Sequence, residues 1–436
     1  MINLKNNIKK INGYILLNGG QLYDSYTGLY EKLDILIKDG LISKIDKNIK
    51  SKSEYEIIDC KNKIVTNGFV DIHSHFREPG FEYKESLYSG SISAFYGGYT
   101  RVCVMPNTDP VIDSPELVEY IINKSKELPV YIYPIGTITK GQKGIELSEI
   151  GGMVDSGAVA ISDDGIAILN SQILRSALEY SKKFNIPVIN HAEDLSLVNE
   201  GLMNEGINSL KLGLPGNPDI SESTMVYRDL SIAQFVSGKI HVPHVSTKKS
   251  VEIIRKFKNQ GFKLTSEVSP HHLSLTDCSL LDYYTHAKVA PPLRSDLDRM
   301  ALIEGIKDGT IDCIATDHAP HSIDDKEKDI KHAPCGMIGL ESAFGLVNKE
   351  LKKEKLDIKS ILDLFIKNPS NILKIPSNNI KMGELAELNI IDPDLSWVFK
   401  NKDIKSKSLN SAVIGNELVG KVLATVNKGF ILQKNK

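Results

Sequence analysis

The sequence predicts an α/β protein in which a (β/α)8, TIM-like barrel carries a small β-sandwich domain built from both chain termini. Two observations lead to this fold class. Apolar strand-like runs alternate with amphipathic helical stretches through the middle of the chain, as in proteins with parallel sheets. Both ends carry short strand-like runs separated by turns. We therefore expect residues 1–66 and 381–436 to form one β domain and residues 67–380 to form the barrel.

The middle of the chain supplies the expected barrel strands and helices. Strands are expected at residues 68–72, 101–105, 130–135, 158–161, 187–190, 239–245, 263–268 and 311–315. Helices are expected at residues 114–126, 171–184, 223–236 and 248–259, among others. A doubly wound parallel sheet would give a similar alternation, so periodicity alone leaves both architectures open.

The chain ends show the shorter, turn-separated strands of a β domain. Runs at residues 13–18, 33–38 and 41–46 open the chain, and Asp39-Gly40 between the last two predicts a hairpin turn. Runs at residues 387–391, 412–415, 417–426 and 429–432 close it. The most polar stretch, residues 322–331, is expected to be an exposed loop after the eighth barrel strand.

Composition narrows the classes of function. The 436 residues have a formal net charge of -2 and no basic tract interleaved with aromatic residues, which argues against a nucleic-acid partner. The five cysteines lack CxxC spacing, so neither a thiolate metal site nor a disulfide framework is expected. We find no signal-peptide pattern and no apolar run of roughly 18 residues, and therefore expect a cytoplasmic protein.

The strongest local motif is Asp71-Ile72-His73-Ser74-His75, at the end of the first expected barrel strand. Residues two apart in a strand point to the same face, so His73 and His75 should project together. The carboxyl end of a barrel strand is where active sites lie. Two imidazoles that converge there supply half of a metal site.

Further potential ligands fall where other expected strands give way to loops. His191, His244 and Asp317 each follow such a strand, and Asp163-Asp164-Gly165 follows another. A carboxylate from the aspartate pair could bridge two metal ions, although the residues themselves leave the choice between Asp163 and Asp164 open. A set of nitrogen and oxygen ligands suits zinc, with manganese or cobalt as substitutes.

Several longer stretches carry a family resemblance. They are His73-Ser74-His75-Phe76-Arg77-Glu78-Pro79-Gly80, Met105-Pro106-Asn107-Thr108, Ser162-Asp163-Asp164-Gly165, His191-Ala192-Glu193-Asp194, His244-Val245-Ser246-Thr247, Pro291-Pro292-Leu293-Arg294 and Ala315-Thr316-Asp317-His318-Ala319-Pro320-His321. Through them the chain resembles the class I dihydroorotases of the amidohydrolase superfamily, over essentially its whole length.

The resemblance implies a reaction and a pair of zinc ions per subunit. The reaction is the reversible cyclisation of N-carbamoyl-L-aspartate to (S)-dihydroorotate in pyrimidine (UMP) biosynthesis, run in reverse by hydroxide attack on the ring amide. One metal would be held by His73, His75 and Asp317, and the other by His191 and His244. Asp164 would bridge them, because it precedes His191 by the family's spacing of 27 residues. Asp317 would also transfer the proton.

The resemblance also implies how the substrate is bound. Arg77 would grip the substrate carboxylate, for which a guanidinium fork is better suited than a lysine. Asn107, His321 and backbone groups of Cys335 and Gly336 would make further contacts. The family usually carries asparagine before Pro-Pro-Leu-Arg, where this chain has Ala290, so one hydrogen-bonding side chain is missing from the expected pocket.

The other histidines are expected to be structural. His271 and His272 are adjacent and cannot both face inward, so loop packing is the better interpretation for them. His241, His286 and His332 lack a partner pattern, and His318 is expected to support its neighbour or the fold. Cys335 has no evident activating base and is not expected to be a nucleophile.

Two other functions remain open. A related cyclic amidohydrolase, such as an allantoinase or a hydantoinase, would share the metal framework. A non-catalytic homologue could instead serve as a structural partner of aspartate carbamoyltransferase, although all six ligand positions are filled here. The resemblance also implies a homo-oligomer, a dimer being expected.

Overall fold

The central strands are parallel and run in chain order. The structure is a computed structural model that describes residues 7–376 and 379–434. A three-stranded sheet contains β7 (Phe69–Ser74), β8 (Tyr99–Val104) and β9 (Tyr131–Pro134). A five-stranded sheet contains β10 (Ile161–Ser162), β11 (Val188–Ile189), β14 (Ile240–Val242), β15 (Thr265–Val268) and β16 (Cys313–Ile314). All eight expected central strands are therefore confirmed, several of them shorter than expected.

Two isolated parallel bridges join these sheets at their outer strands. Gly136, just after β9, pairs with Ile161 of β10, and Ser74 of β7 pairs with His318, just after β16. The backbone between these ends is also bonded, because Asp317 N donates to His73 O at 2.9 Å and His75 N donates to His318 O at 2.9 Å. The first and last central strands are thus neighbours in space.

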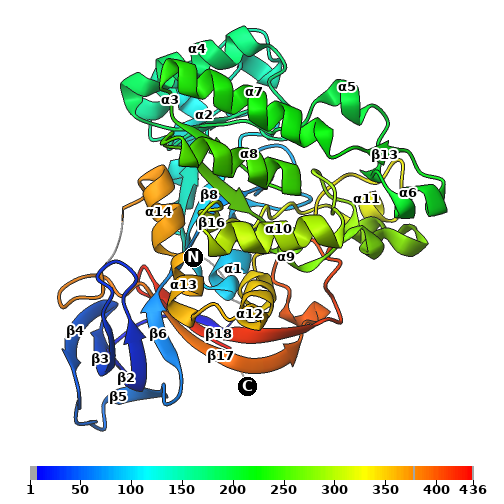
Figure 1. The fold of residues 1–436 in the computed structure, drawn as a ribbon. Coiled ribbons are helices and arrows are strands. Elements are labelled where there is room, and N and C mark those ends of the chain that lie inside the picture. The colour runs from blue at the N-terminus through cyan, green and yellow to red at the C-terminus, as the bar shows by residue number, and fades with distance from the viewer. Residues whose placement is uncertain (1–6, 377–378, 435–436) are drawn as a thin grey trace.

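Helices pack around these strands in the upper part of the view in Figure 1. They are α1 (Leu87–Gly97), α2 (Pro115–Ser125), α3 (Ile150–Asp155), α4 (Ser171–Ser181), α5 (Leu195–Val198), α6 (Ile207–Leu212), α7 (Ile220–Val236), α8 (Lys248–Asn259), α9 (Pro270–Ser274), α10 (Asp296–Lys307), α11 (Ile323–Lys326), α12 (Ala343–Lys353), α13 (Ile358–Asp363) and α14 (Lys367–Leu373). Short 3-10 turns are η1 (Lys140–Gln142), η2 (Lys182–Phe184), η3 (Asp277–Tyr283), η4 (Thr285–Ala287) and η5 (Asn401–Asp403). β12 (Met203–Asn204) and β13 (Gly216–Asn217) pair with each other in a separate, parallel two-stranded sheet.

The helix boundaries follow from local chemistry. Thr247 precedes α8, and its side chain accepts a hydrogen bond from Ser250 N, which satisfies one of the free N–H groups at the helix start. Pro115 occupies the first turn of α2, where its missing N–H costs nothing. The expected helices at 114–126, 171–184, 223–236 and 248–259 are confirmed within a few residues.

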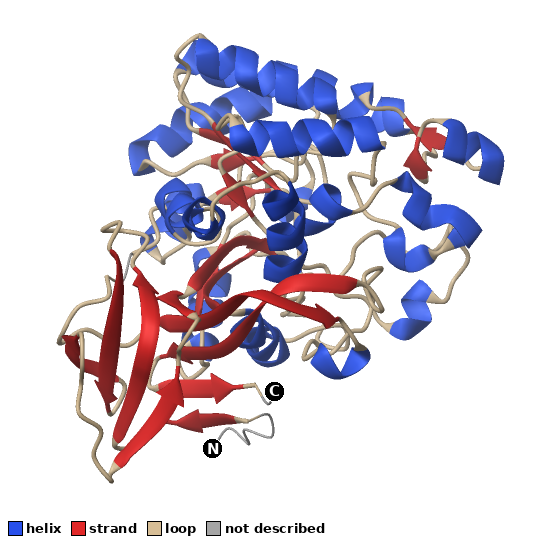
Figure 2. Cartoon of the chain, turned by 60° about the horizontal axis from the view of Figure 1, so that its bottom comes forward, coloured by secondary structure: helices blue, strands red, loops and turns tan. Residues whose placement is uncertain are grey.

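The two chain ends pair in a nine-stranded sheet (Figure 2). The N-terminal strands are β1 (Ile8–Lys10), β2 (Tyr14–Tyr23), β3 (Tyr30–Lys38), β4 (Leu41–Asp46), β5 (Tyr55–Asp59) and β6 (Ile64–Asn67), and the C-terminal strands are β17 (Leu388–Val398), β18 (Glu417–Asn427) and β19 (Phe430–Gln433). Antiparallel pairs β6–β17 and β1–β19 connect the ends. The hairpin between β3 and β4 turns at Asp39 and Gly40, both with positive φ (50° and 86°), as a type I′ turn requires.

One expected strand is wrong. Residues 412–415 form turns rather than a strand. Gly415 has a φ of 89°, and Asn416 N donates back to Val413 O at 3.0 Å, so this backbone is folded on itself. A strand was expected here because Val413 is apolar. In the structure Val413 is buried in a cluster with Phe399 and Leu418, which explains its residue type without a strand.

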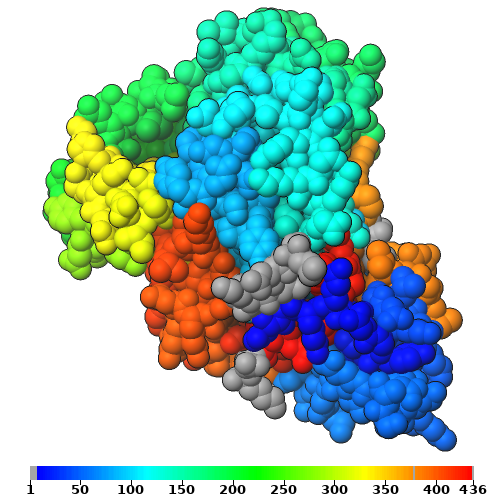
Figure 3. All heavy atoms as spheres, turned by 180° about the vertical axis from the view of Figure 1, so that it is seen from behind, coloured from blue at the N-terminus to red at the C-terminus, as the bar shows by residue number. Residues whose placement is uncertain are grey.

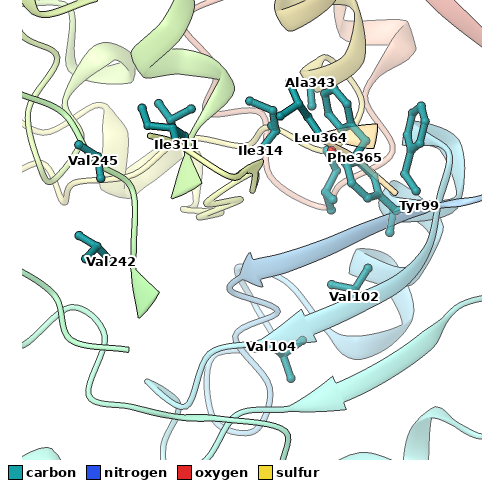
Figure 4. Packing of buried hydrophobic residues seen from close by; sticks show 14 of the residues in the cluster. Tyr99, Val102, Val104, Val242, Val245, Ile311, Ile314, Ala343, Leu364 and Phe365 are labelled. Atoms are coloured by element: carbon teal, nitrogen blue, oxygen red, sulfur yellow. The ribbon is translucent and has the colours of Figure 1, made fainter. Parts of the chain in front are cut away.

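The main hydrophobic core lies between the central strands and their helices (Figure 4). Val102 and Val104 of β8, Val242 of β14 and Ile314 of β16 all belong to it. Phe69 opens β7 and packs its ring against Tyr99, Phe344 and Phe365 at centroid distances of 5.1 to 5.7 Å. Full burial of a side chain such as that of Phe69 contributes about 1.5–3 kcal/mol to the stability of the folded chain. The core therefore stabilises the strands whose ends carry the polar site.

Buried polar contacts join the nine-stranded sheet to the central strands. Arg101 of β8 makes a two-pronged ion pair with Glu387, from Nε to Oε1 at 2.7 Å and from Nη2 to Oε2 at 2.8 Å. Asn427 Nδ2 of β18 donates to Thr100 O and to Pro129 O. In the described ranges, no helix is both long enough and apolar enough to cross a bilayer.

Candidate active site

Three predicted ligands meet where β7 and β16 end side by side. His73 lies in β7, His75 just beyond it, and Asp317 just beyond β16. Asp317 Oδ1 is 3.2 Å from His75 Nε2 and 3.6 Å from His73 Nε2. The paired backbones of these two strands place the three side chains together, as the alternation within β7 predicted.

Asp164, not Asp163, faces the histidines. Asp164 Oδ1 lies 3.5 Å from His73 Nε2, 3.6 Å from His191 Nδ1 and 3.4 Å from His244 Nε2, and its Oδ2 lies 3.4 Å from His75 Nε2. Asp163 is instead bonded to the backbone: its Oδ1 accepts hydrogen bonds from the N–H groups of Ile138 (2.7 Å) and Thr139 (3.1 Å). Of the two aspartates between which the residues alone left the choice open, Asp164 is the one that contacts the histidines.

The geometry of this cluster fits cation ligands. Two overlapping groups, His73 with Asp164 and His244, and His73 with His75 and Asp317, each bring three ligand atoms within 4.8 Å of one another. His191 Nδ1 lies 3.0 Å from His244 Nε2. Among the described residues, His73 Nε2 and Asp164 Oδ1 are buried without a hydrogen-bond partner. Such atoms are costly when left alone, so these residues could hold metal ions.

The far side of each of two ligand rings is bonded to a buried carboxylate. His73 Nδ1 donates to Glu267 Oε1 at 2.6 Å, and His191 Nε2 donates to Glu193 Oε2 at 2.8 Å. These bonds fix the ring tautomer, so the other nitrogen presents its lone pair to the site. Burial opposes ionisation of Glu267, but His73 and His241 lower its pKa to about 2. Sequence reasoning gave neither glutamate a role, although Glu193 lies in the quoted stretch His191-Ala192-Glu193-Asp194.

Asn107 has a different contact from the one expected. Its Oδ1 accepts a hydrogen bond from His75 Nδ1 at 2.8 Å, so its carbonyl end orients a predicted metal ligand. Only its amide nitrogen remains for the expected contact with a substrate. Asn107 therefore links the histidine cluster to the expected binding pocket.

His271 is a correction to the sequence analysis. It was expected to pack in a loop with His272, but both residues lie in the short helix α9, where His272 bonds Ser269 Oγ (2.7 Å) and Pro291 O (3.0 Å). His271 Nε2 instead lies buried, 4.0 Å from Asp317 Oδ2 and without a hydrogen-bond partner in the described ranges. The short helix α9 turns the two neighbours by about 100° relative to each other, so they face different surroundings.

The predicted recognition residues gather beside the histidine cluster. Arg77 Nη2 lies 3.3 Å from His321 Nε2, and Arg77 Nε donates to Pro320 O at 3.2 Å. His321 Nε2 lies 2.8 Å from Cys335 O, and Lys84 Nζ lies 3.4 Å from His321 Nδ1. Burial, with the charges of Arg77, Lys84 and Lys326, lowers the pKa of His321 to about 2. The imidazole is therefore neutral, with Nε2–H donating to Cys335 O.

Three site residues hold a backbone conformation that is rare outside glycine. The φ angles are 60° at Arg77, 30° at His244 and 48° at Asp317. A left-handed conformation costs a residue with a side chain energy, and such strain clusters at functional sites. Each of these positions follows a central strand, where the chain must turn sharply to present its side chain.

A residue from the C-terminal region completes this side of the site. Asn410 Oδ1 accepts from His321 N at 3.0 Å, and Asn410 Nδ2 donates to Ala319 O (3.0 Å) and Gly336 O (3.1 Å). Figure 3 shows the orange-red segment that contains Asn410 beside the yellow segment that follows β16. Nothing in the sequence marked Asn410, because its partners are backbone groups distant in the chain.

The predicted state of the cysteines is confirmed. All five are free, Cys60, Cys103 and Cys313 being buried and Cys278 and Cys335 exposed. His318, expected to be supporting, accepts at Nδ1 from Gly339 N at 3.1 Å. Its Nε2 lies 3.5 Å from Glu85 Oε2, so it braces the segment behind Asp317.

Solved structures of hydantoinases have the same fold as this chain. The chain superposes on the L-hydantoinase (dihydropyrimidinase) from Arthrobacter aurescens with a TM-score of 0.84 at 22% identity, covering 98% of this chain and 97% of that one. It superposes on a D-hydantoinase from Thermus sp. with a TM-score of 0.80 at 20% identity, covering 96% and 95%. At these identities the likeness concerns the fold.

Sequence comparison narrows the class to one family. The chain is 46% identical over 424 residues to the dihydroorotase of Acetivibrio thermocellus, and 44% identical over 421 residues to that of Geobacter metallireducens. These alignments cover 97% and 96% of this chain and 99% of each relative. A dihydro-orotase-like family model matches residues 62–250. The chain belongs to the dihydroorotase family, and the predicted family and enzyme class, a hydrolase of cyclic amides, are confirmed.

Proposed function

We propose that this chain is a dihydroorotase that interconverts (S)-dihydroorotate and N-carbamoyl-L-aspartate in pyrimidine biosynthesis. One observation carries the proposal: a buried cluster of four histidines and two aspartates lies next to Arg77 and His321 in a chain of this family. The cluster would hydrolyse an amide, and Arg77 and His321 beside it are suited to bind a carboxylate. Dihydroorotate has both groups, a ring amide and a carboxylate.

The fold we propose to underlie this site is a closed (β/α)8 barrel. Its support is the chain-order pairing of the eight central strands together with the bridges Gly136–Ile161 and Ser74–His318. The site would then lie at the carboxyl rim of the barrel. We further propose that residues 1–66 and 381–436 form a β-sandwich domain and residues 67–380 the barrel.

The proposed cofactor is a pair of zinc ions per subunit, for which manganese or cobalt could substitute. His73, His75 and Asp317 would hold one, His191 and His244 the other, and Asp164 would bridge them. When bound, the ions would polarise the ring carbonyl and lower the pKa of a water molecule. The orphaned His73 Nε2 and Asp164 Oδ1 support this assignment.

Asp317 is proposed to move the proton. In hydrolysis an oxygen–carbon bond forms at the ring amide carbonyl while the carbon–nitrogen bond breaks. The Asp317 carboxylate would take the proton of the attacking water and deliver it to the departing ring nitrogen. Its pKa lies well below the usual range, because the hydrogen bond with His75 and the charge of His73 outweigh burial, so it starts as an acceptor. Ring closure follows the same steps backwards.

Substrate recognition is proposed to fall to Arg77, Asn107, His321 and the peptide at Cys335 and Gly336. Arg77 would bind the carboxylate with its free guanidinium nitrogens. His321, neutral and held by Cys335 O, would present its ring edge. The backbone N–H of Gly336 donates to Lys288 O at 2.9 Å, which leaves the Cys335 N–H as the donor proposed to meet the substrate.

The alternatives differ in substrate or in catalysis. The fold neighbours include hydantoinases, an allantoinase would share the same metal framework, and a non-catalytic partner of aspartate carbamoyltransferase would lack turnover. Steady-state hydrolysis of dihydroorotate, hydantoin and allantoin by the purified protein, with its metal content measured, separates all three. We expect two metal ions per chain and a preference for dihydroorotate; preference for either other ring would overturn the proposal.

Three expectations about the surroundings of the protein stay predictions. They are a homodimer, an association with aspartate carbamoyltransferase and a cytoplasmic location. Sedimentation of the purified chain, alone and mixed with the carbamoyltransferase, tests the first two.

A further inference from the structure

Two lysines are buried behind the recognition side of the site. Lys326, at the end of α11, is 1% exposed, and Lys288 is 5% exposed. Lys326 Nζ donates to Pro334 O (2.9 Å), Gly336 O (3.0 Å) and Lys288 O (3.4 Å). An ammonium group has three N–H donors, so Lys326 is fully satisfied by main-chain carbonyls rather than by carboxylates.

Lys288 is bonded in the same way to the same loop. Its Nζ donates to Ile330 O (2.7 Å), Ala333 O (2.7 Å) and Lys331 O (3.3 Å). Its own carbonyl accepts from Gly336 N at 2.9 Å. The two lysines therefore form a brace that joins the loop after α11, residues 327–336, to Lys288, directly after η4.

We propose that Lys326 is a positioning residue for substrate binding, which holds and polarises the peptide between Pro334 and Cys335 so that the Cys335 N–H meets the substrate carboxylate. The inference rests on the proposed function. It assigns a task to a lysine in the stretch that the sequence presented as an exposed polar loop, and it makes Lys288 a second support of the same loop, on either side of that peptide.

Peptide geometry gives Lys326 this role. In a trans peptide the N–H points opposite to the C=O. The bond from Lys326 Nζ to Pro334 O therefore directs the Cys335 N–H away from the ammonium. No described residue accepts a hydrogen bond from that N–H, whereas Cys335 O is already bonded to His321 Nε2 at 2.8 Å. A cation on the carbonyl oxygen also strengthens the N–H of the same peptide as a donor.

The charge of Lys326 reaches the recognition side. Lys326, Arg77 and Lys84 each contribute to lowering the pKa of His321, so three cations act on the same imidazole. Among the described residues, only carbonyl oxygens accept hydrogen bonds from the buried Lys326 ammonium group, so its positive charge makes the surroundings favourable for an anion. The carboxylate of the proposed substrate is such an anion, and it would arrive where Arg77 and the Cys335 N–H converge on His321.

The brace also bears on how the loop moves. A polar loop after the last central strand could serve as a lid. Five hydrogen bonds from two buried ammonium groups fix residues 330–336 instead. We therefore expect this part of the loop to be preformed before substrate binds.

The test compares Lys326→Met with wild type as metal-loaded full-length proteins. Methionine keeps the length of the side chain and removes the charge and all three donors. We expect KM for dihydroorotate to rise at least tenfold, with kcat within threefold and metal content unchanged. Lys326→Gln, which keeps two donors without the charge, should fall between the two proteins. Lys328→Met is the matched control, because Lys328 is half exposed and pairs with Asp325; its KM should equal that of wild type.

A purely structural lysine would give a different result. It would lower stability and kcat together while leaving KM within twofold, and that outcome overturns the proposal. If neither Lys326 variant folds, hydrogen exchange on the wild type decides. The amides of Ala333 and Gly336, which donate to Asp329 O and Lys288 O, should be protected without substrate, and rapid exchange there would overturn the brace. Failure of the wild type to hydrolyse dihydroorotate would instead refute the proposed function, independently of these variants.

Discussion

The two sides of the candidate site are supported by opposite charges. Behind the histidine cluster stand buried carboxylates, with Glu267 bonded to His73 and Glu193 bonded to His191. Behind Arg77 and His321 stand the buried ammonium groups of Lys326 and Lys288. Negative support increases the basicity of ligands for cations, whereas positive support favours a bound anion. The two sides therefore differ in the charge that supports them, which is the difference that the proposed division between metal ions and a substrate carboxylate requires.

The largest effect is expected from removing the proposed proton-transfer group, Asp317, from the side of the site that contains the histidine cluster. Asp317→Asn keeps the shape of the side chain but cannot accept a proton. We expect kcat for dihydroorotate to fall by about 10²- to 10⁴-fold, measured with the metal content of the variant determined in parallel. Asp394→Asn, at a carboxylate that is 78% exposed, should leave kcat unchanged. A fully metallated Asp317 variant with wild-type kcat would exclude the proposed role.

The carboxylate support can be tested without touching a ligand. Glu193→Gln weakens the bond that orients His191, so metal affinity should fall by about 10- to 100-fold, as measured by competition with a chelator. Glu146→Gln, at a side chain that is 69% exposed, is the control. Equal affinities in Glu193→Gln and wild type would mean that the carboxylate does not support the metal side.

The recognition side should respond in KM instead. Arg77→Lys replaces a two-pronged donor with a single ammonium group. Losing a hydrogen bond to a charged group costs about 1.5–3 kcal/mol, so we expect KM for dihydroorotate to rise by roughly 10- to 100-fold with metal affinity unchanged. Arg255→Lys, at a pair with Asp308 on the surface, controls for the substitution itself. A change in metal affinity without a change in KM would contradict the division of the site.

The ammonium support has a pH signature in stability. Burial lowers the pKa of Lys326 from 10.5 to about 8. Between these values the unfolded chain binds more protons at this group than the folded one, so the folded state gains stability as pH rises. The unfolding free energy of wild type minus that of Lys326→Met should rise by about 1 kcal/mol per pH unit in this window. Urea unfolding at pH 8, 9 and 10 measures it; a flat difference would contradict a depressed pKa.

The smallest effect is expected at Ala290. Restoring the asparagine usual in the family adds one hydrogen-bonding side chain beside the cis peptide before Pro291. A neutral hydrogen bond is worth about 1 kcal/mol, so KM for dihydroorotate should fall about fivefold in Ala290→Asn. Unchanged KM would indicate that this position does not reach the substrate in this chain.

The sequence predicted the residues of the histidine cluster better than their supports. His73, His191 and Asp317 could be recognised because each follows an apolar run, and the carboxyl ends of parallel strands converge. Glu267 lies inside β15, where a single acidic residue carries no pattern of its own. The eight central strands followed from the same alternation, although strand ends shifted by up to three residues.

The supports of the recognition side were hidden for another reason. Lys326 was placed in an exposed polar loop because lysine is usually exposed. Its burial depends on three carbonyls contributed by residues 288, 334 and 336, and such backbone contacts leave no trace in residue type. Asn410 was missed likewise, and His271 was misplaced because the turn of a five-residue helix was not foreseen.

Asn410 also limits how far the chain can be shortened from its C-terminal end. It belongs to the stretch between η5 and β18, far beyond residue 380, yet its amide clasps the main chain on both sides of His321. A fragment cut at residue 380 would retain all six histidine and aspartate side chains of the cluster. It would lose the clasp on His321 together with the buried contacts that join the nine-stranded sheet to the central strands, so residues beyond 380 belong to the support of the site.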